Sequence, residues 1–218
     1  MKPLIVIPAY NSNNFINKLI KKIIDQTDVE ILVIDDGSIN KITIDNKNDV
    51  ILIRNKTNRG KGYVLKKAIK YALKNSFTHI LTMDSDLQHD PKHLNEFLEF
   101  EKDVDIVFGR REFSNPMPIH RIFSNKITSF IISFLVKNKI KDSQSGYRRY
   151  KLSLFKNVNL KENGFHFESE LILKCVNKNT KIGHILIDTI YNNSISSINN
   201  FSDTYKFIKL IFRHCFAK

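Results

Sequence analysis

Short apolar runs alternate with amphipathic stretches through the first half of the chain. The runs are rich in Ile and Val, which is typical of buried strands, and they cover residues 4–7, 31–34, 50–53, 80–83 and 104–108. Apolar residues spaced three and four apart between the runs predict helices with one buried face. Two such faces are clear: Phe15, Leu19, Ile20, Ile23 and Ile24, then Val64, Leu65, Ala68, Ile69 and Ala72. This alternation predicts an α/β fold, with a mostly parallel central sheet flanked by helices.

The second half is less regular. We expect loops at residues 112–118, 142–149 and 192–200, helices at 120–137 and 167–176, and a strand at 182–187. The chain closes with a basic amphipathic stretch whose apolar face holds Phe201, Tyr205, Ile208 and Phe212. Such a helix either lies on an anionic membrane surface or packs on the core. We expect a catalytic domain over residues 1–199 and this helix over residues 200–218.

Polar segments follow three of the predicted strands, at residues 8–11, 35–38 and 84–88. Ligands of parallel sheets bind at the carboxyl ends of strands, so these segments are expected to converge. Asp84 and Asp86 come directly after an apolar run; if the chain stays extended there, both point to one side and hold Mg²⁺ or Mn²⁺. Asp90 and Pro91 have the pattern of a helix N-cap followed by proline at the first helical position.

Charge is distributed unevenly. The net charge is +13; residues 1–109 carry 16 basic and 15 acidic side chains, whereas residues 110–218 carry 19 and 7. A basic second half suggests an anionic partner such as nucleic acid, acidic lipid or a phosphorylated substrate, although a lysine-rich compositional bias is an alternative. The two cysteines lack metal-type spacing and suit a reducing cytoplasm. We expect neither a signal peptide nor a membrane span, because the longest apolar window, residues 127–136, is far below the ~20 residues required.

Six ordered segments together resemble a GT-A glycosyltransferase of family 2, within the group of polyprenyl-phosphate sugar synthases. They are residues 7–11 (IPAYN), 33–38 (VIDDGS), 58–62 (NRGKG), 84–91 (DSDLQHDP), 109–111 (GRR) and 142–148 (DSQSGYR). The resemblance implies the GT-A fold, a Rossmann-like nucleotide-diphospho-sugar transferase fold, and a cofactor ion of Mg²⁺ or Mn²⁺. A lone Asp-x-Asp is a weak signal, whereas the ordered set is specific.

The resemblance also implies roles for individual residues. Pro8, Ala9, Tyr10, Asp36, Asp84 and Ser85 would bind the donor, and Asp84, Asp86 and Gln88 would hold the metal. Arg111 would face the acceptor phosphate together with Ser124 and a basic residue upstream of it, for which His120 and Arg121 compete. Asp86, Arg111 and Arg121 would be the catalytic set. Lys61 is a secondary candidate, and Gly60 and Gly62 permit a tight entry into the next helix.

Two departures from the family pattern bear on the donor. Ser12 stands where family members often have an acidic residue, and Thr189 and Ile195 stand where the mannose synthases place basic residues. These differences weaken a GDP-mannose assignment, so that a UDP-hexose is at least as favoured. UDP- and GDP-sugars both stay open.

The resulting hypothesis is an inverting transfer of a hexose from a nucleotide sugar to a polyprenyl phosphate. The expected partners are the donor, the lipid and peripherally the cytoplasmic face of a membrane, with a membrane-protein partner possible and no nucleic acid. The runner-up is transfer to a sugar hydroxyl, which needs a base such as Glu168 or Glu170. A nucleic-acid-binding module is a remote alternative that leaves the acidic segments unexplained. A sugar nucleotidyltransferase would need a glycine-rich basic loop after the first strand, where this chain has residues 8–11 instead.

Overall fold

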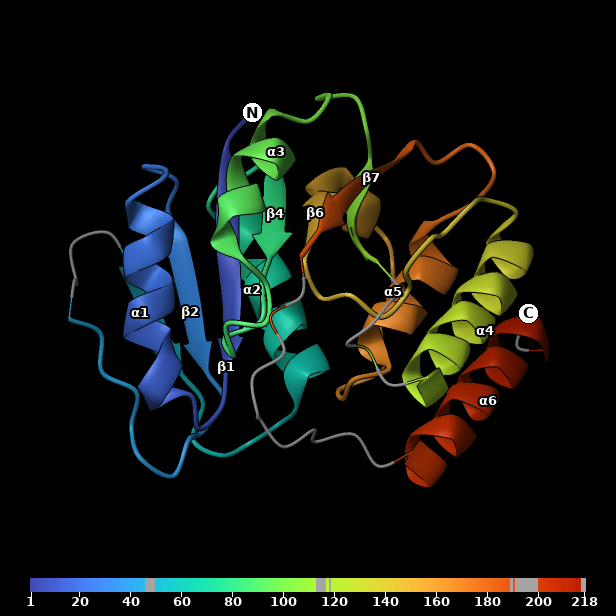
Figure 1. The fold of residues 1–218 in the computed structure, drawn as a ribbon, viewed down its shortest axis with the longest axis horizontal. Helices are drawn as coiled ribbons and strands as arrows, with labels where there is room; N and C mark the ends of the chain where they lie inside the picture. Colours follow the sequence, from blue (N-terminus) through green and yellow to red (C-terminus); the bar gives the residue numbers. More distant parts are fainter. Residues whose placement is uncertain (46–49, 113–116, 118, 189, 191–199, 217–218) are drawn as a thin grey trace.

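A seven-stranded sheet forms the centre of the protein (Figure 1). The computed structural model describes residues 1–45, 50–112, 117, 119–188, 190 and 200–216. The strands are β1 (Pro3–Ala9), β2 (Ile31–Asp35), β3 (Val50–Arg54), β4 (His79–Thr82), β5 (Ile106–Arg111), β6 (Arg148–Lys151) and β7 (Ile182–Ile187). The helices are α1 (Asn13–Ile24), α2 (Lys61–Lys74), α3 (Leu94–Glu99), α4 (Ile119–Val136), α5 (Phe167–Cys175) and α6 (Asn200–Phe216). Two 3-10 turns are η1 (Pro91–His93) and η2 (Leu152–Phe155).

The strand order is β3-β2-β1-β4-β6-β5-β7. Strands β3, β2, β1 and β4 pair in parallel, and so do β5 and β7. Among the described strands only β6 is antiparallel to its neighbours, and it lies between β4 and β5. The chain turns outward in opposite directions from β1, toward β2 on one side and β4 on the other. Such a switch point is where open α/β sheets bind ligands.

Side chains of the strands alternate between two buried clusters on the two faces of the sheet. Leu4 and Val6 of β1 join the cluster formed with α2, α5 and parts of α4 and α6. Ile5 and Ile7 join the opposite cluster, which α1 and α3 cover. The sheet is therefore buried on both faces between helical layers, as the near-continuous apolar runs predict.

The predicted α/β architecture is confirmed, since each of the five predicted strands of the first half and the one at residues 182–187 is present. The helices predicted at residues 120–137 and 167–176 match α4 and α5 within one residue. The prediction of a polar loop over residues 142–149 is wrong at its end, because Arg148 begins β6. Arg149, the last residue of this predicted loop, is fully buried.

Backbone carbonyl oxygens accept hydrogen bonds from both buried arginines. Arg148 donates to the carbonyl oxygens of Ser145 and Ser143 at 2.6 and 2.7 Å, and its guanidinium lies 5.1 Å from the ring centre of Phe108. Arg149 donates to the carbonyl oxygens of residues 97, 100 and 101, at the end of α3, at 2.7–3.0 Å. A positive charge is favourable at a helix C-terminus, where carbonyl groups lack helical partners. A strand with this polar sequence is therefore stable only inside this fold.

Helix α6 packs on the core through Leu210, which is buried, and through the half-buried Phe207 and Ile211. The sequence predicts that this helix either lies on a membrane surface or packs on the core. It packs on the core, and it also keeps an exposed apolar side. The domain boundary at residue 199 stays a prediction. Within the described parts of the chain, no helix is both long and apolar enough to cross a bilayer. Most of the loops predicted at residues 112–118 and 192–200, together with Thr189, Ile195 and the side chain of Phe201, lies outside the described residues.

Replacing Arg149 by methionine should destabilise the fold. The change keeps an unbranched apolar stem but leaves three carbonyl oxygens without donors, that of Phe97 in a buried position, so we expect the free energy of unfolding to fall by about 2–4 kcal/mol. Urea unfolding measures this, with the exposed Lys102→Met as the matched control. An unchanged midpoint would contradict a structural role for Arg149.

Candidate active site

The carboxyl ends of β1, β2, β4 and β5 lie along one edge of the sheet. Because β6 runs in the opposite direction, its beginning lies at this edge, with Arg148 paired to both Thr82 and Phe108. The loop over residues 142–147 therefore lies next to the acidic segment that follows β4. The Thr82 hydroxyl donates to the carbonyl oxygen of Gly146 at 2.7 Å and ties the two segments together.

The acidic segment after β4 turns sooner than expected. The strand ends at Thr82, the chain forms a turn at Ser85 and Asp86, and Leu87 has a φ of 61°. The prediction of a chain still extended through Asp86 is therefore wrong. Gln88 donates its backbone N–H to Asp86 Oδ1 at 3.0 Å, which closes the turn. The predicted cap is confirmed, because Asp90 Oδ1 accepts from Lys92 N at 3.1 Å and Pro91 opens η1.

Lys61 joins this segment to two helices. Its Nζ lies 2.6 Å from Asp84 Oδ1 and 3.1 Å from Glu168 Oε1. Burial alone would raise the pKa of Asp84, but the Lys61 ammonium overrides it and lowers the pKa to about 2. Burial alone would lower the pKa of Lys61, whereas its two carboxylate partners raise it above the ordinary value. The three groups are a charged cluster that brings the start of α2 and the start of α5 to the end of β4.

Asp86 completes the acidic pair. Burial, and after it the charge of Asp84, raises the pKa of Asp86 above its ordinary value. A divalent cation between two carboxylates relieves this kind of repulsion, and their oxygen donors suit Mg²⁺ or Mn²⁺. No group of three or more His, Cys, Asp or Glu residues in the described part of the chain is arranged to hold a metal. An ion at Asp84 and Asp86 would therefore complete its shell with other oxygen atoms, such as those of water, a diphosphate or Gln88.

Three glycines make the close approach around Lys61 possible. A Cβ on Gly146 would lie 2.5 Å from Asp84 Oδ2 and 2.9 Å from Lys61 Nζ. A Cβ on Gly62 would lie 2.6 Å from the Cβ of Phe167. Gly60 precedes α2 with a φ of 92°, a conformation that favours glycine, which bears out the predicted tight entry into the helix. Segments from different parts of the sequence thus meet at these glycines, where a larger residue would clash with its neighbours.

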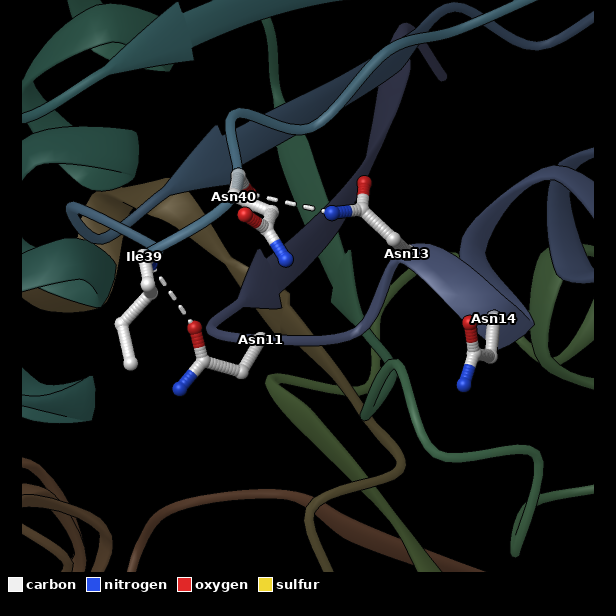
Figure 2. A pocket seen from close by; sticks show the side chains of 5 residues that line it. All are labelled: Asn11, Asn13, Asn14, Ile39 and Asn40. Atoms are coloured by element: carbon white, nitrogen blue, oxygen red, sulfur yellow. Dashed lines mark hydrogen bonds between the residues drawn. The ribbon is translucent and has the colours of Figure 1, made fainter.

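The predicted donor residues at positions 8–10, at the end of β1, lie at the neighbouring part of the edge. Tyr10 is 46% exposed and Pro8 is partly exposed, whereas the side chain of Ala9 is buried. The next residue, Asn11, accepts from Ile39 N at 2.9 Å and borders an open cavity of about 220 Å³, shown in Figure 2. The cavity is lined by Asn11, Asn13, Asn14, Ile39 and Asn40 and does not include the acidic pair.

The hydroxyl oxygen of Ser12 is buried beside this region and has no hydrogen-bond partner among the described atoms. Ser12 precedes the first residue of α1, and its carbonyl oxygen accepts from Phe15 N and Ile16 N. Its side chain makes no capping hydrogen bond. The position where the family often has an acid thus carries an unsatisfied polar group next to the predicted nucleotide pocket.

Asp36 is already engaged inside the protein. Its carboxylate accepts from Asn55 Nδ2 at 2.7 Å, from Arg59 N at 3.0 and 3.1 Å, and from Gly60 N at 2.7 Å. These bonds fix the approach to α2 and so help to place Lys61. A carboxylate offers only about four acceptor positions, and the hydrogen bonds within the protein already use this number. The role of Asp36 in binding the donor stays a prediction.

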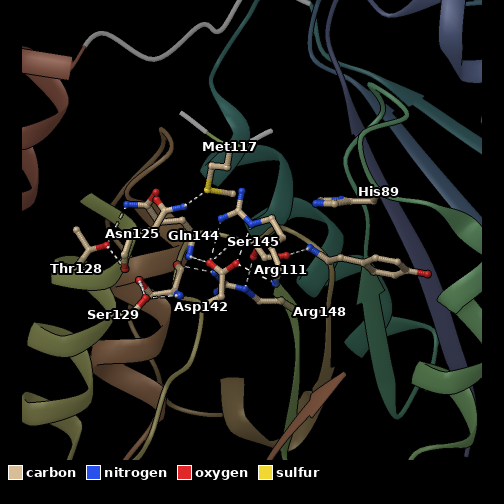
Figure 3. A network of polar contacts seen from close by, with 12 residues as sticks. His89, Arg111, Met117, Asn125, Thr128, Ser129, Asp142, Gln144, Ser145 and Arg148 are labelled. Atoms are coloured by element: carbon tan, nitrogen blue, oxygen red, sulfur yellow. Dashed lines mark hydrogen bonds and ion pairs between the residues drawn. The ribbon is translucent and has the colours of Figure 1, made fainter. Parts of the chain in front are cut away.

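Arg111 ends β5 and faces the loop before β6. Its Nε and Nη2 donate to the two carboxylate oxygens of Asp142 at 2.7 and 3.0 Å, within the polar network of Figure 3. Burial alone would raise the pKa of Asp142, but Arg111 and the backbone N–H of Gln144 hold it below the ordinary value. This two-point contact fixes the plane of the guanidinium.

His89 contacts the acidic segment after β4, and the charges of Arg111 and Asp142 also act on it. Its Nδ1 accepts from Asp84 N at 3.4 Å, and its ring lies 5.5 Å from that of Tyr147. Burial lowers the pKa of His89 to about 4, with opposing effects from Asp84 and from Lys61 and Arg111. The imidazole is therefore neutral at physiological pH. Neither His89 nor Asp142 was predicted from the sequence to be a functional residue.

The other predicted acceptor residues lie on the first turns of α4. Arg121 is partly exposed, Ser124 is exposed, and the side chain of His120 lies outside the described atoms. Asn125, one residue further, is buried and its Nδ2 lies 3.9 Å from the sulfur of Met117. The choice between His120 and Arg121 stays open.

A family model described as "Glycosyl transferase family 2" matches residues 4–160, which is more than half of the chain. The chain belongs to this family. It is a glycosyltransferase.

Two curated relatives agree with the predicted polyprenyl-phosphate group. The chain is 27% identical to a UDP-N-acetylglucosamine–dolichyl-phosphate N-acetylglucosaminyltransferase of Methanococcus voltae, over 86% of this chain and 85% of the relative.

The second relative is a polyprenol monophosphomannose synthase of Mycolicibacterium smegmatis, 22% identical over 85% of this chain and 76% of the relative. Among solved structures, a glucosyl-3-phosphoglycerate synthase from Mycobacterium tuberculosis with Mn²⁺, UDP and glucosyl-3-phosphoglycerate matches with a TM-score of 0.70. The identity is 15%, and the match covers 98% of this chain and 79% of that one. This likeness confirms the predicted GT-A fold.

Adding a methyl group at Gly146 should disable the site while leaving the fold intact. The Cβ of alanine would lie 2.5 Å from Asp84 Oδ2 and displace the carboxylate, so we expect turnover to fall on the order of 100-fold. Steady-state kinetics measure this. The matched control is Gly164→Ala, because nothing lies within 4 Å of a Cβ there. Equal turnover of the two variants would show that the packing around Asp84 is not required.

Asp142 should make the stability of the protein depend on pH. Its folded pKa lies below the ordinary value, so its contribution is present above about pH 4 and is lost as the pH falls through the lowered pKa. Asp142→Asn should therefore remove about 3 kcal/mol at neutral pH and less in acid, because the asparagine leaves Arg111 without its counter-ion. Urea unfolding from neutral to acidic pH, with the exposed Asp25→Asn as the control, tests this. A difference from wild type that is independent of pH would contradict it.

Proposed function

We propose that the protein transfers a hexose from a nucleotide sugar to a polyprenyl phosphate with inversion of configuration and with the help of a divalent cation. The observation that supports this proposal is the cluster of Asp84, Asp86 and Lys61 at the switch point of the sheet, with the Arg111–Asp142 pair at the same edge. An acidic pair and a basic group therefore lie at the same edge. A donor diphosphate and an acceptor phosphate need this combination of charges.

The donor end of the site supports binding of a nucleoside diphosphate. Pro8, Tyr10 and Ser85 lie at the ends of β1 and β4, and Asp84 and Asp86 would hold Mg²⁺ or Mn²⁺ with Gln88 beside them. When bound, such an ion neutralises negative charge that develops on a departing diphosphate. The solved neighbour carries UDP with Mn²⁺, and the same protein has also been solved with Mg²⁺ and UDP.

The acceptor end supports a phosphate as the nucleophile. Arg111 is held flat by Asp142 at the end of β5, and Arg121 and Ser124 lie on the first turns of α4. A guanidinium fixed in this way suits a phosphate oxygen, since arginine recognises planar pairs of oxygen atoms. Both named relatives act on dolichyl or polyprenol phosphates by their names.

The transfer itself is a displacement at the anomeric carbon. An oxygen of the acceptor phosphate forms the new bond to this carbon while the bond to the donor diphosphate breaks and the diphosphate leaves with the electron pair. A phosphate monoester has a second pKa near ~6 and is largely a dianion at neutral pH, so no protein group needs to remove a proton. The neutral His89 matches this scheme, because it supports the backbone of Asp84 rather than acting as a base.

We further propose that the reaction takes place at the cytoplasmic face of a membrane, where the lipid acceptor is found, with residues 1–199 as the catalytic domain. The charge of the second half supports an anionic partner. However, not all of its 19 basic residues are available to such a partner. Arg148 and Arg149 are buried and Arg111 is paired, so the remaining charge lies mainly on lysines. A membrane-protein partner stays an option.

Transfer to a hydroxyl group is the second candidate, and one observation favours it. Glu168 lies within the charged cluster, 3.1 Å from Lys61, where a carboxylate is available as a base. Glu170 does not fit this role, because it is buried and accepts from Lys161 N, Glu162 N and Lys174 Nζ. The named solved neighbour is a synthase of glucosyl-3-phosphoglycerate, so the acceptor panel must include 3-phosphoglycerate.

The deciding assay incubates the purified protein and Mn²⁺ or Mg²⁺ with a short polyprenyl phosphate and a panel of UDP- and GDP-sugars. We expect a glycolipid that forms only with the cation present. Free sugar hydroxyls and 3-phosphoglycerate are tested in parallel. Product from a hydroxyl acceptor alone would overturn the phosphate acceptor, and no affinity for any nucleoside diphosphate would overturn the proposal entirely.

Asp86→Asn should abolish cation-dependent transfer, with a loss on the order of 100-fold or more, because an amide is a poor substitute for a carboxylate on Mg²⁺. The fold should persist, since the asparagine side chain can still accept the hydrogen bond from Gln88 N that closes the turn. Titration with Mn²⁺ monitored by electron spin resonance gives a second measurement beside turnover. Asp90→Asn is the matched control, because asparagine is an equally good helix cap. Unchanged Mn²⁺ binding by Asp86→Asn would remove this residue from the metal site.

A further inference from the structure

Helix α4 carries apolar residues on two sides, because it buries Ile132 and Val136 in the core and also exposes large apolar residues. The side chains that it buries include Asn125 and Ser129, and the Ser129 hydroxyl hydrogen-bonds to Ser143 at 2.9 and 3.1 Å. Its outward side carries large apolar residues at a spacing of three and four. These exposed residues are Ile119, Phe123, Ile127, Phe130 and Phe134, of which Phe130 and Phe134 are 73% and 75% exposed. A helix that only packs on a core has a polar outward side.

Helix α6 adds a second exposed apolar row. It is anchored to the core by Leu210 and by an ion pair between Arg213 and Glu162. Its outward apolar residues are Tyr205, Ile208, Phe212 and Phe216, and the rings of the last two stack at 5.6 Å. Figure 1 shows α4 and α6 side by side at the edge of the molecule away from α1, and both contribute to the same buried cluster. We call the two rows together the aromatic face.

The charge around the aromatic face is mainly positive. Residues 119–141 contain five basic and no acidic residues, and residues 200–216 contain three basic residues and one acidic residue, Asp203. Lys126 on α4 and Lys206 and Lys209 on α6 are exposed. Aromatic rings flanked by an excess of lysines are typical of helices that lie in the interface of an anionic bilayer.

We propose that the aromatic face is a docking surface for an anionic lipid bilayer, with α4 and α6 lying on the membrane plane. A second copy of the chain fits less well, because a symmetric contact through this face would bring the same lysines together. A protein partner would have to supply an apolar and acidic surface. An anionic bilayer offers headgroup phosphates to the lysines and acyl chains to the phenylalanines at once.

One consequence of this docking surface depends on the proposed function. Arg121 and Ser124 lie on the first turns of α4, the helix whose outward side would touch the membrane. Docking through α4 would therefore bring the acceptor part of the site to the height of lipid headgroups. The phosphate group of a polyprenyl phosphate could then reach the site while its hydrocarbon chain stays in the bilayer.

The test measures binding to vesicles in the absence of donor and acceptor. Wild-type protein is floated with vesicles of phosphatidylcholine alone or mixed with phosphatidylglycerol, at low and high salt. We expect binding to the anionic vesicles that weakens with salt. A triple variant, Phe130→Ser, Phe134→Ser and Phe212→Ser, should bind at least about tenfold more weakly, because it removes three large apolar side chains from the contact.

The matched control is Leu73→Ser with Leu186→Ser, which removes exposed apolar side chains from other surfaces. The triple variant should keep its circular dichroism spectrum and its affinity for nucleoside diphosphate, since none of its positions lies in the active site. Binding to neutral and anionic vesicles alike, no binding at all, or equal binding by the triple variant would overturn the proposal. A concentration-dependent dimer that the triple variant loses would assign the face to a second copy and overturn it as well. Because no substrate is present, failure of the proposed function would leave this result unchanged.

Discussion

The arrangement of the site depends on one buried ammonium group held between two carboxylates. Lys61 contacts Asp84 at the end of β4 and Glu168 at the start of α5, so a single side chain connects three elements that are distant in sequence. A buried charge is tolerated only where its partners are in place, and the glycines at positions 60, 62 and 146 leave the space for them. The acidic pair is thus positioned by the protein itself, before any ligand is considered.

Much of this architecture could be predicted from local pattern. Each of the parallel strands is an apolar run, and α1 and α2 follow from their spacing of apolar residues, because burial on both faces of a sheet leaves a strong signal. Strand β6 could not be predicted in this way. Its sequence, RRYK, has the composition of a surface loop, and Arg148 and Arg149 become buried only because carbonyl groups from other segments surround them.

The candidate site was predictable to a similar degree. The acidic, tyrosine and arginine segments carry recognisable residue types at strand ends, and the family match agrees with them. The partners of Lys61, Arg111 and Asp36 did not follow from the sequence, because a long side chain gives no indication of which distant residue it will meet. The expected extended course through Asp86 failed for a related reason: the hydrogen bond from Gln88 N favours a turn that no apolar periodicity marks.

The place of β6 in the sheet also has a consequence for the order in which the molecule assembles. Strand β5 pairs with β6 and β7 and has no direct pairing with β4, although β4 precedes it in the chain. During synthesis, β1 to β4 can join as soon as they emerge, whereas β5 waits for partners that follow it by some forty residues or more. The loop that brings Gly146 against Asp84 arrives with β6. The half of the sheet that contains the acidic pair can therefore form first during synthesis, and the catalytic edge would then be completed when β6 arrives.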